Sequence, residues 1–363
     1  MHVALLANTA WLDEELGSMK HLVVGLLDEA VRVTHVLPAG RAEGEEIAFG
    51  RRLAWNETRH RRANRKELRK LTDELSAAEV DLIHALDGRL WPSAIELGQL
   101  LDVPVVLTAN STMDIEQARS LGHEIDFART AITAATAPLG EMVRQVVGEQ
   151  ALVRTVPPGV HAGRDVAQAL APAQAGEEGE LCVVVSGDGG LDEPMRQLLQ
   201  GIHMALDDET EMQFFFDGQG IDQHKLWRTI EKLGLLRNST LIPRRLGHRE
   251  ILLRANALVH PQALGKARSL TLRAMACGLP VISVADEALD YLQPETTARV
   301  LNDPTPEDWC QCLLWLARQR SEAAALGQRS HQWVREHRPV SAQIESLLHV
   351  YRSLTGETLP FPG

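Results

Sequence analysis

The residues best suited to bind an anion lie between two predicted strands, from His260 to Gly278. The first strand ends at His260, and the loop that follows contains Gly265 and two basic residues. Ser269 then opens a helical pattern that stops before Gly278, and we expect its hydroxyl to cap that helix. Backbone N–H groups and the dipole at a helix start suit a diphosphate. The candidate anion ligands are Lys266, Arg268, Ser269, Leu270, Thr271 and Arg273.

Other polar residues and one glycine follow predicted strands elsewhere in the chain. Ligands of parallel α/β sheets bind at the carboxyl ends of the strands. Two such sheets facing each other would direct both sets of loops into one interdomain cleft. The cleft candidates are Asn8, Gly17, His84, Asn110 and His260. For the two histidines, a buried structural role is the alternative interpretation.

Short aliphatic runs alternate with longer helical patterns, which is typical of parallel sheets. The first series of expected strands is 2–7, 31–37, 80–85, 103–108, 130–135 and 152–156, and the second is 181–186, 212–216, 239–242, 257–259, 280–284 and 298–301. The expected helices include 67–78, 93–101, 194–205, 222–233, 249–254 and 269–277, and the chain is helical from 306 to 354 with a break near Pro339. The sequence therefore predicts two tandem, Rossmann-like, doubly wound α/β domains.

Length and composition fit this plan. A chain of 363 residues suggests two domains, and 44% hydrophobic residues can form ordinary cores. No apolar run reaches about 18 residues, so no membrane span is expected. The start, Met1–Asn8, resembles a first strand and not a signal peptide. Four cysteines without zinc-ligand spacing indicate no metal site and fit a reducing cytoplasm. The net charge of −12 argues against nucleic-acid binding.

One stretch of the chain is strongly basic, from Arg51 to Lys70. One interpretation is a solvated helix face with Glu57 and Glu67 as local partners. The other is a patch that contacts an anionic lipid surface or an anionic acceptor, which would make the protein peripheral to the membrane. Its basic residues are Arg51, Arg52, Arg59, Arg61, Arg62, Arg65, Lys66, Arg69 and Lys70.

The run Ala274-Met275-Ala276-Cys277-Gly278-Leu279-Pro280-Val281 resembles the signature of the GT-B glycosyltransferases, in particular the retaining enzymes of family 4. Weaker matches follow the order of that family, including Phe216-Asp217-Gly218-Gln219-Gly220 and Val156-Pro157-Pro158-Gly159-Val160. The resemblance covers about residues 1–350. It implies a GT-B fold, a UDP- or GDP-sugar as donor substrate and no cofactor. It adds Gly187, Gly218 and Gly220 to the donor-binding candidates.

The resemblance also implies a division of the chain into domains. Residues 1–162 form the acceptor-side domain, 163–180 the linker and 181–338 the donor-side domain. Residues 339–363 form a last helix that packs back on the first domain. The segment 161–180 is rich in alanine, glycine, proline and glutamate, which independently indicates a linker.

The chain departs from the family at the residues that perform its chemistry. Gly265 and Arg273 stand where family members have two glutamates, and neither side chain accepts hydrogen bonds as a glutamate does. Acidic residues, Asp188 and Glu193, stand where the family has phosphate-binding Arg and Lys. Carboxylates there would repel a diphosphate. Positive charge relocated to Lys266, Arg268 and Arg273 could compensate, unless these form a solvated basic loop or a salt bridge.

Three hypotheses on function stay open at this point. The first is a divergent glycosyltransferase that acts on a glycan, lipid or protein acceptor. The second is a non-catalytic relative that serves as a scaffold or as the partner of another protein, which the clustered departures favour. The third is a nucleotide-sugar epimerase of the same fold, for which no acid/base constellation is evident. Fold alone does not decide between them.

Overall fold

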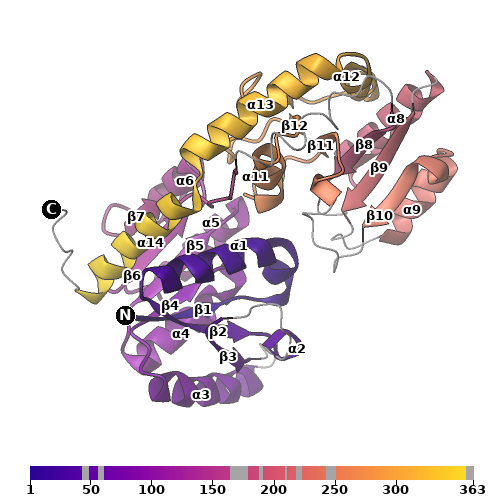
Figure 1. Cartoon of the computed structure of the whole chain (residues 1–363). Helices are drawn as coiled ribbons and strands as arrows, with labels where there is room; N and C mark the ends of the chain where they lie inside the picture. The colour runs from indigo at the N-terminus through magenta and orange to yellow at the C-terminus, as the bar shows by residue number, and fades with distance from the viewer. Residues whose placement is uncertain are drawn as a thin grey trace. The chain divides into compact units, whose positions relative to one another are not determined.

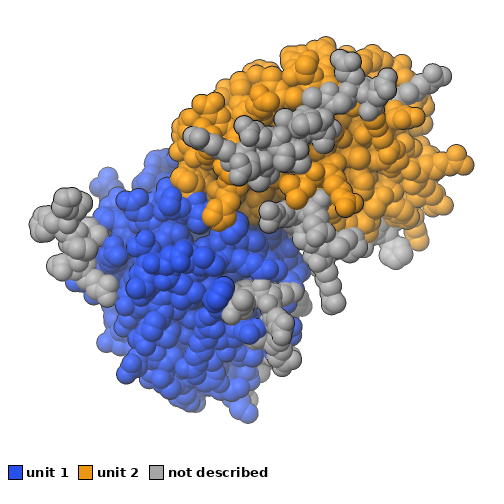
Figure 2. Space-filling model, in the orientation of Figure 1, with its two compact units in different colours: residues 1–159, 265–267, 340–363 blue, residues 160–264, 268–339 orange. Residues whose placement is uncertain are grey.

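A computed structural model describes residues 1–42, 49–55, 61–163, 179–187, 191–208, 211–217, 223–242 and 251–356. The chain forms two compact units, coloured separately in Figure 2. Unit 1 comprises Met1–Gly159, Gly265–Ala267 and Val340–Gly363, and unit 2 comprises Val160–Leu264 and Arg268–Pro339. Each unit is an α/β domain built around one parallel sheet (Figure 1).

The sheet of unit 1 has seven strands among the described residues, in the order β3-β2-β1-β4-β5-β6-β7. Every pair of neighbouring strands is parallel. The strand order reverses between β1 and β4, so the topological switch point lies there. The strands are β1 (His2–Leu6), β2 (Arg32–Leu37), β3 (Arg51–Ala54), β4 (Leu82–Ala85), β5 (Val105–Ala109), β6 (Thr130–Ala134) and β7 (Leu152–Thr155).

Helices cover both faces of this sheet, which explains why β1, β4 and β6 are buried along their whole length. The helix α1 (Thr9–Asp28) packs beside the last helix, α14 (Val340–Thr355). At their contact, a Cβ on Gly25 would lie 2.5 Å from Ile344 Cγ1, so only glycine fits. The other helices of unit 1 are α2 (Ala39–Ala42), α3 (Arg61–Ala77), η1 (Gly88–Leu90), α4 (Trp91–Leu101), α5 (Thr112–Leu121) and α6 (Ala137–Val147).

A chain of polar side chains joins α14 to the sheet of unit 1. On β4, His84 has its Nδ1 atom 2.6 Å from the Tyr351 hydroxyl and its Nε2 atom 2.6 Å from Thr108 Oγ1. Thr108 Oγ1 in turn lies 2.9 Å from Thr133 Oγ1. Burial lowers the pKa of His84 to about 3, because the charged imidazolium would lose its hydration. The imidazole is therefore neutral and structural.

Unit 2 repeats the architecture of unit 1. Its sheet has six described strands in the order β10-β9-β8-β11-β12-β13, again parallel throughout, with the switch point between β8 and β11. The strands are β8 (Leu181–Val185), β9 (Met212–Asp217), β10 (Ser239–Ile242), β11 (Ala257–His260), β12 (Val281–Val284) and β13 (Arg299–Leu301).

The core of unit 2 lies between this sheet and the helices α8 (Glu193–Asp207) and α12 (Pro306–Arg318). The two helices approach closely at Gly201, where a Cβ would lie 2.5 Å from the Cβ of Trp309. Phe214 and Phe216 on β9 complete this apolar cluster. The remaining described helices of unit 2 are α9 (Gln223–Lys232), η2 (Leu236–Asn238), α11 (Ser269–Ala276) and α13 (Arg320–His337).

The prediction of two doubly wound parallel sheets is confirmed, and each predicted strand is present within a few residues of its expected position. The helical break near Pro339 is also confirmed, since α13 ends at His337 and α14 begins at Val340. The interpretation of the basic stretch as a helix face is wrong for Arg51–Ala54, which forms β3, whereas its second part lies on the helix α3. Most of the predicted linker, 164–178, lies outside the described residues. No helix in the described ranges has the length and apolarity to cross a bilayer.

The neutral state of His84 predicts a pH dependence of stability. Its pKa is lower in the folded protein than the ordinary value of about 6.5, so protonation favours the unfolded chain. Stability is therefore lost as pH falls below about 6.5, by about 1 kcal/mol between pH 6 and pH 5. Urea unfolding of unit 1 should show this slope in the wild type and a shallower one in His84→Gln. The exposed His123, changed to Gln, is the control. An unchanged slope in His84→Gln would contradict the assignment.

Candidate functional site

The carboxyl ends of β8 and β11 meet at the switch point of unit 2. Ser186 follows β8 directly, and its Oγ atom lies 2.8 Å from Nδ1 of His260, the last residue of β11. Both side chains are buried. This hydrogen bond fixes the two strand ends relative to each other at the point where α/β sheets bind ligands. His260, a predicted cleft residue, is therefore buried and positions the strand ends.

The loop after β8 is held by side chains from the loop after β11. The buried Arg268 guanidinium donates from Nη1 to the carbonyl oxygen of Gly187, over 2.7 Å. Gln262, also buried, donates from Nε2 to Asp192 Oδ2, over 2.8 Å. A Cβ on Gly187 would lie 2.5 Å from Gln262 Oε1, so glycine is required where these segments meet. Asp192 uses its other oxygen to cap α8, at 3.1 Å from the Met195 nitrogen.

The helix α11 begins beside this loop, and the prediction that Ser269 caps it is wrong. Arg268 is the N-cap in extended conformation, Ser269 is the first helical residue, and the cap residue makes no side-chain hydrogen bond to the first turn. A serine side chain must precede the helical turn to cap it, and Ser269 lies within that turn. First-turn N–H groups have no partner within a helix, and those of Leu270 and Thr271 belong to this class.

The end of α11 follows the prediction closely. Gly278 has φ +74°, the left-handed conformation that glycine adopts most easily. Leu279 N donates to Ala274 O over 3.0 Å, and Gly278 N donates to Met275 O over 2.8 Å. These two bonds form a Schellman motif. The only residue of α11 that is not buried is Arg273.

Gly265 has a backbone that disfavours any side chain. Its φ is +57°, and a Cβ there would lie 2.6 Å from Thr112 Oγ1. The backbone pairs in the same place, since Thr112 N donates to Gly265 O over 2.9 Å and Ala267 N donates to Asn110 O over 2.8 Å. The segment Gly265–Ala267 is thus held by the loop after β5, which places it in unit 1.

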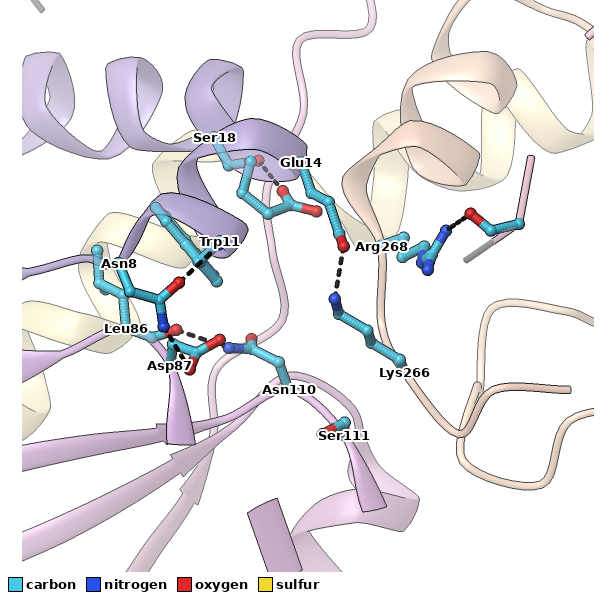
Figure 3. A network of polar contacts seen from close by, with 12 residues as sticks. Asn8, Trp11, Glu14, Ser18, Leu86, Asp87, Asn110, Ser111, Lys266 and Arg268 are labelled. Atoms are coloured by element: carbon cyan, nitrogen blue, oxygen red, sulfur yellow. Dashed lines mark hydrogen bonds and ion pairs between the residues drawn. The ribbon is translucent and has the colours of Figure 1, made fainter. Parts of the chain in front are cut away.

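A polar network lies at the switch point of unit 1 (Figure 3). Asn8, after β1, donates to Asp87 Oδ1 over 2.7 Å and caps α1 by accepting from the Trp11 nitrogen over 2.8 Å. Asn110, after β5, donates to the Leu86 carbonyl oxygen over 2.8 Å. The network therefore joins the ends of three strands, and two of its members, Asn8 and Asn110, are sequence candidates.

Lys266 points into unit 1, where its Nζ atom lies 2.6 Å from Oε2 of Glu14 on α1. Figure 3 shows the Lys266 side chain directed at Glu14 and the Arg268 side chain directed at a different partner, the Gly187 carbonyl. The three basic candidates therefore do not share one environment, since Lys266 is ion-paired, Arg268 is buried and Arg273 lies on the side of α11.

Sequence reasoning missed three acidic residues, Glu14, Asp87 and Asp114. Asp114 completes a capping box with Ser111 at the start of α5, and burial raises its pKa above the ordinary value. Its carboxylate fills the space beside Gly88, where a Cβ would lie 2.0 Å from Asp114 Oδ1. A capping-box search would have found Asp114, and Asp87 directly follows a buried strand. No local signal relates Glu14 to Lys266.

The remaining sequence candidates have separate positions. His84 lies in the core of unit 1, and Gly17 lies within α1, two residues after a kink at Glu15. Gly218 and Gly220 lie outside the described residues. Among the residues that the structure describes, no group of His, Cys, Asp and Glu side chains could hold a metal ion.

The environment of Gly265 predicts a specific cost for adding a side chain there. Gly265→Ala should destabilise unit 1 by about 1–2 kcal/mol through its left-handed backbone and by about 1–3 kcal/mol more through the contact with Thr112. Gly234→Ala is the matched control, since Gly234 has φ +73° and no neighbouring atom within 4 Å. Calorimetric unfolding measures both, and adding Thr112→Ala should recover part of the loss only in the Gly265 variant. Equal losses in the two glycine variants would show that Thr112 does not restrict the position.

Comparison with known proteins supports the fold. No protein-family model matches the chain, and no curated protein matches it in sequence. Among solved structures, the chain is similar to Anabaena HepE in complex with UDP-glucose, with a TM-score of 0.76 at 14% identity over 98% of this chain and 100% of that chain. It is also similar to sucrose-phosphate synthase of Thermosynechococcus elongatus, with a TM-score of 0.75 at 15% identity over 99% of this chain and 100% of that chain. The similarity to MurG of Acinetobacter baumannii has a TM-score of 0.59 at 12% identity over 98% of this chain and 99% of that chain. The two parallel-sheet domains thus have the fold of GT-B glycosyltransferases.

Proposed function

We propose that unit 2 binds the diphosphate of a nucleotide sugar and that the protein transfers that sugar to an acceptor. The position of Arg268 supports this proposal. Arg268 is the N-cap residue of α11, is buried, and donates from its guanidinium to the Gly187 carbonyl oxygen in the loop after β8. A buried cation beside the first turn of a helix is a strong combination for an anion. The structurally similar Anabaena protein is in complex with UDP-glucose, which is a nucleotide sugar.

The chemistry of transfer requires positive charge at this place. When the bond between the sugar and the diphosphate breaks, negative charge builds on the leaving diphosphate, and fixed donors stabilise it. The donor-binding residues in unit 2 are Gly187, Arg268, Ser269, Leu270, Thr271 and Arg273. Arg268 takes the role that the family 4 pattern gives to basic residues after the first strand of the donor-side domain. The nucleotide sugar is a substrate, and no separate cofactor is part of the proposal.

The assignment to family 4 rests on residues 274–281. They span the end of α11, its Schellman motif and the start of β12, so the matching residues form a helix end that is determined by packing. The acceptor is a glycan, a lipid or a protein.

A non-catalytic relative is the second candidate, and Gly265 favours it. The glycine backbone and the contact with Thr112 leave no room for an acidic side chain where the family pattern has one. Such a protein would bind the nucleotide sugar, or a partner protein, without turnover. An epimerase has less support, because the sequence shows no acid/base constellation for it.

Nucleotide binding tests the proposal directly. We expect calorimetric titration with UDP, GDP and ADP to show micromolar binding of one of them. Arg268→Met should weaken it by at least about tenfold, since a hydrogen bond to a charged group contributes about 1.5–3 kcal/mol. Arg268→Lys keeps the positive charge, so it shows whether a loss of binding in Arg268→Met comes from a failure to fold. Arg119→Met, which removes an exposed arginine, is the control. Release of nucleoside diphosphate from the matching conjugate distinguishes the transferase from the non-catalytic relative. No binding of any nucleotide would contradict the transferase and would leave only a non-catalytic relative that binds a partner protein.

The basic surface of unit 1 supports a membrane-peripheral position for this activity. Leu68, Leu71 and Leu75 of α3 are buried, so the opposite side of the helix faces solvent. The exposed residues there and on the edge strand β3 include six basic ones, Arg51, Arg52, Arg65, Lys66, Arg69 and Lys70, and one acidic one, Asp73. Phe49, 58% exposed, precedes β3. Basic residues with an exposed aromatic side chain are suited to an anionic bilayer surface.

Vesicle co-sedimentation measures this contact. The protein should bind phosphatidylglycerol vesicles and not phosphatidylcholine vesicles, and added salt should release it. Lys66→Glu combined with Arg69→Glu should weaken binding at least about tenfold, because each basic residue contributes about 1 kcal/mol near an anionic surface. Arg119→Glu with Arg144→Glu, on α5 and α6, is the matched control. Equal binding to both kinds of vesicle would contradict the assignment.

A further inference from the structure

The N-cap residue of α11, Arg268, is held through both its side chain and its backbone by other loops of unit 2. Its guanidinium donates to the Gly187 carbonyl oxygen after β8, over 2.7 Å. Its backbone N–H donates over 3.3 Å to the hydroxyl of Tyr291, which lies in the segment between β12 and β13. Arg268 and Tyr291 are both buried. Segments that follow three strands of one sheet, β8, β11 and β12, therefore meet at this residue.

Tyr291 is itself fixed by the segment between β12 and β13. The buried Thr297 donates from Oγ1 to the Tyr291 carbonyl oxygen over 2.5 Å and accepts from the Gln293 nitrogen over 2.8 Å. On the other side, Asp290 forms an ion pair with Arg338, with 2.6 Å between Asp290 Oδ1 and Arg338 Nη2. The backbone around Tyr291 is thus anchored, and its closely packed ring presents the hydroxyl as a fixed acceptor.

The start of α11 depends on this acceptor because a side-chain cap is absent. The N-cap residue Arg268 has an extended backbone, φ −126° and ψ 132°, and makes no side-chain hydrogen bond to the first turn. A cap normally fixes the first turn of a helix. Here the bond from Arg268 N to the Tyr291 hydroxyl holds the residue from which the turn begins. The N–H groups that follow belong to Ser269, Leu270 and Thr271, which have no acceptor within a helix.

We propose that Tyr291 is a positioning residue for diphosphate binding: it holds the Arg268 backbone, so that the guanidinium and the first-turn N–H groups of α11 are ordered before the ligand binds. The proposal rests on the proposed function and adds to it a residue that does not touch the ligand. Donors that are already ordered contribute more to binding, because no ordering cost is subtracted when the ligand arrives. Tyr291 therefore acts on affinity through Arg268.

Titration calorimetry of the full chain with UDP, GDP and ADP tests this role. Tyr291→Phe removes only the hydroxyl, and it should weaken binding of the nucleotide that the wild type binds by about threefold to tenfold, the range for one neutral hydrogen bond. Tyr351→Phe is the matched control, because Tyr351 is also buried and its hydroxyl contacts His84 in unit 1. It should lower the melting temperature and leave binding unchanged. Unchanged binding in Tyr291→Phe, or an equal loss in Tyr351→Phe, would overturn the proposal.

A double-mutant cycle separates positioning from a general loss of stability. In the Arg268→Met background, Tyr291→Phe should weaken binding by a smaller factor than in the wild type, because the guanidinium that it positions is gone. Equal factors in the two backgrounds would show that Tyr291 does not act through Arg268. Thr297→Val, which removes the hydroxyl that anchors the Tyr291 backbone, should also weaken binding. It replaces Tyr291→Phe in both tests if that variant does not fold, and unchanged binding there would overturn the proposal.

Amide hydrogen exchange reports on the positioning bond without any ligand. The Arg268 amide should exchange faster in Tyr291→Phe than in the wild type, and at the wild-type rate in Tyr351→Phe. An unchanged rate in Tyr291→Phe would overturn the proposal even if binding is weaker. If the wild type binds a nucleotide and Tyr291→Phe binds it equally well, only the positioning role fails. If the wild type binds none of the three, the proposed transferase fails and this inference fails with it.

Discussion

The organisation of both units depends on one constraint, the parallel alignment of neighbouring strands. Parallel strands bring all their carboxyl ends to one edge, and the order reverses once in each sheet. At each reversal a polar pair joins the two strand ends, Asn8 with Asp87 in unit 1 and Ser186 with His260 in unit 2. The central strands are otherwise buried between helices, where unpaired polar groups are costly. The polar chemistry of the chain therefore concentrates at these edges.

Backbone constraints limit which residues can stand at two positions of the chain. Gly187 and Gly265 both lie where a Cβ would overlap a neighbouring side chain. At Gly265 the conformation also disfavours any residue with a Cβ. An acidic residue there would require Thr112 and the paired backbone to move. Arg268, in contrast, is buried and anchored by its hydrogen bond to the Gly187 carbonyl oxygen.

The sequence predicted the sheets well because buried parallel strands are continuous aliphatic runs, as in β1 and β8. It missed β3, since this edge strand carries Arg51 and Arg52 and has no apolar run. The Schellman motif at the end of α11 could be predicted from Gly278. The start of α11 could not be predicted from Ser269, because a shift of one residue in the helix start changes which residue is the cap. The Glu14–Lys266 pair joins residues 252 positions apart, so no spacing rule could predict it.

The chain order of unit 1 has a consequence for how the protein is made. Its core is completed by α14, through Ile344 against Gly25 and Tyr351 against His84, although β1–β7 precede all of unit 2. During synthesis from the N-terminus, the first seven strands leave the ribosome long before α14 does. Until then the α14-facing side of the sheet exposes apolar surface and the His84 imidazole lacks one partner. Unit 2 ends at Pro339, before α14 begins, so the second unit in the sequence is the first that can finish folding.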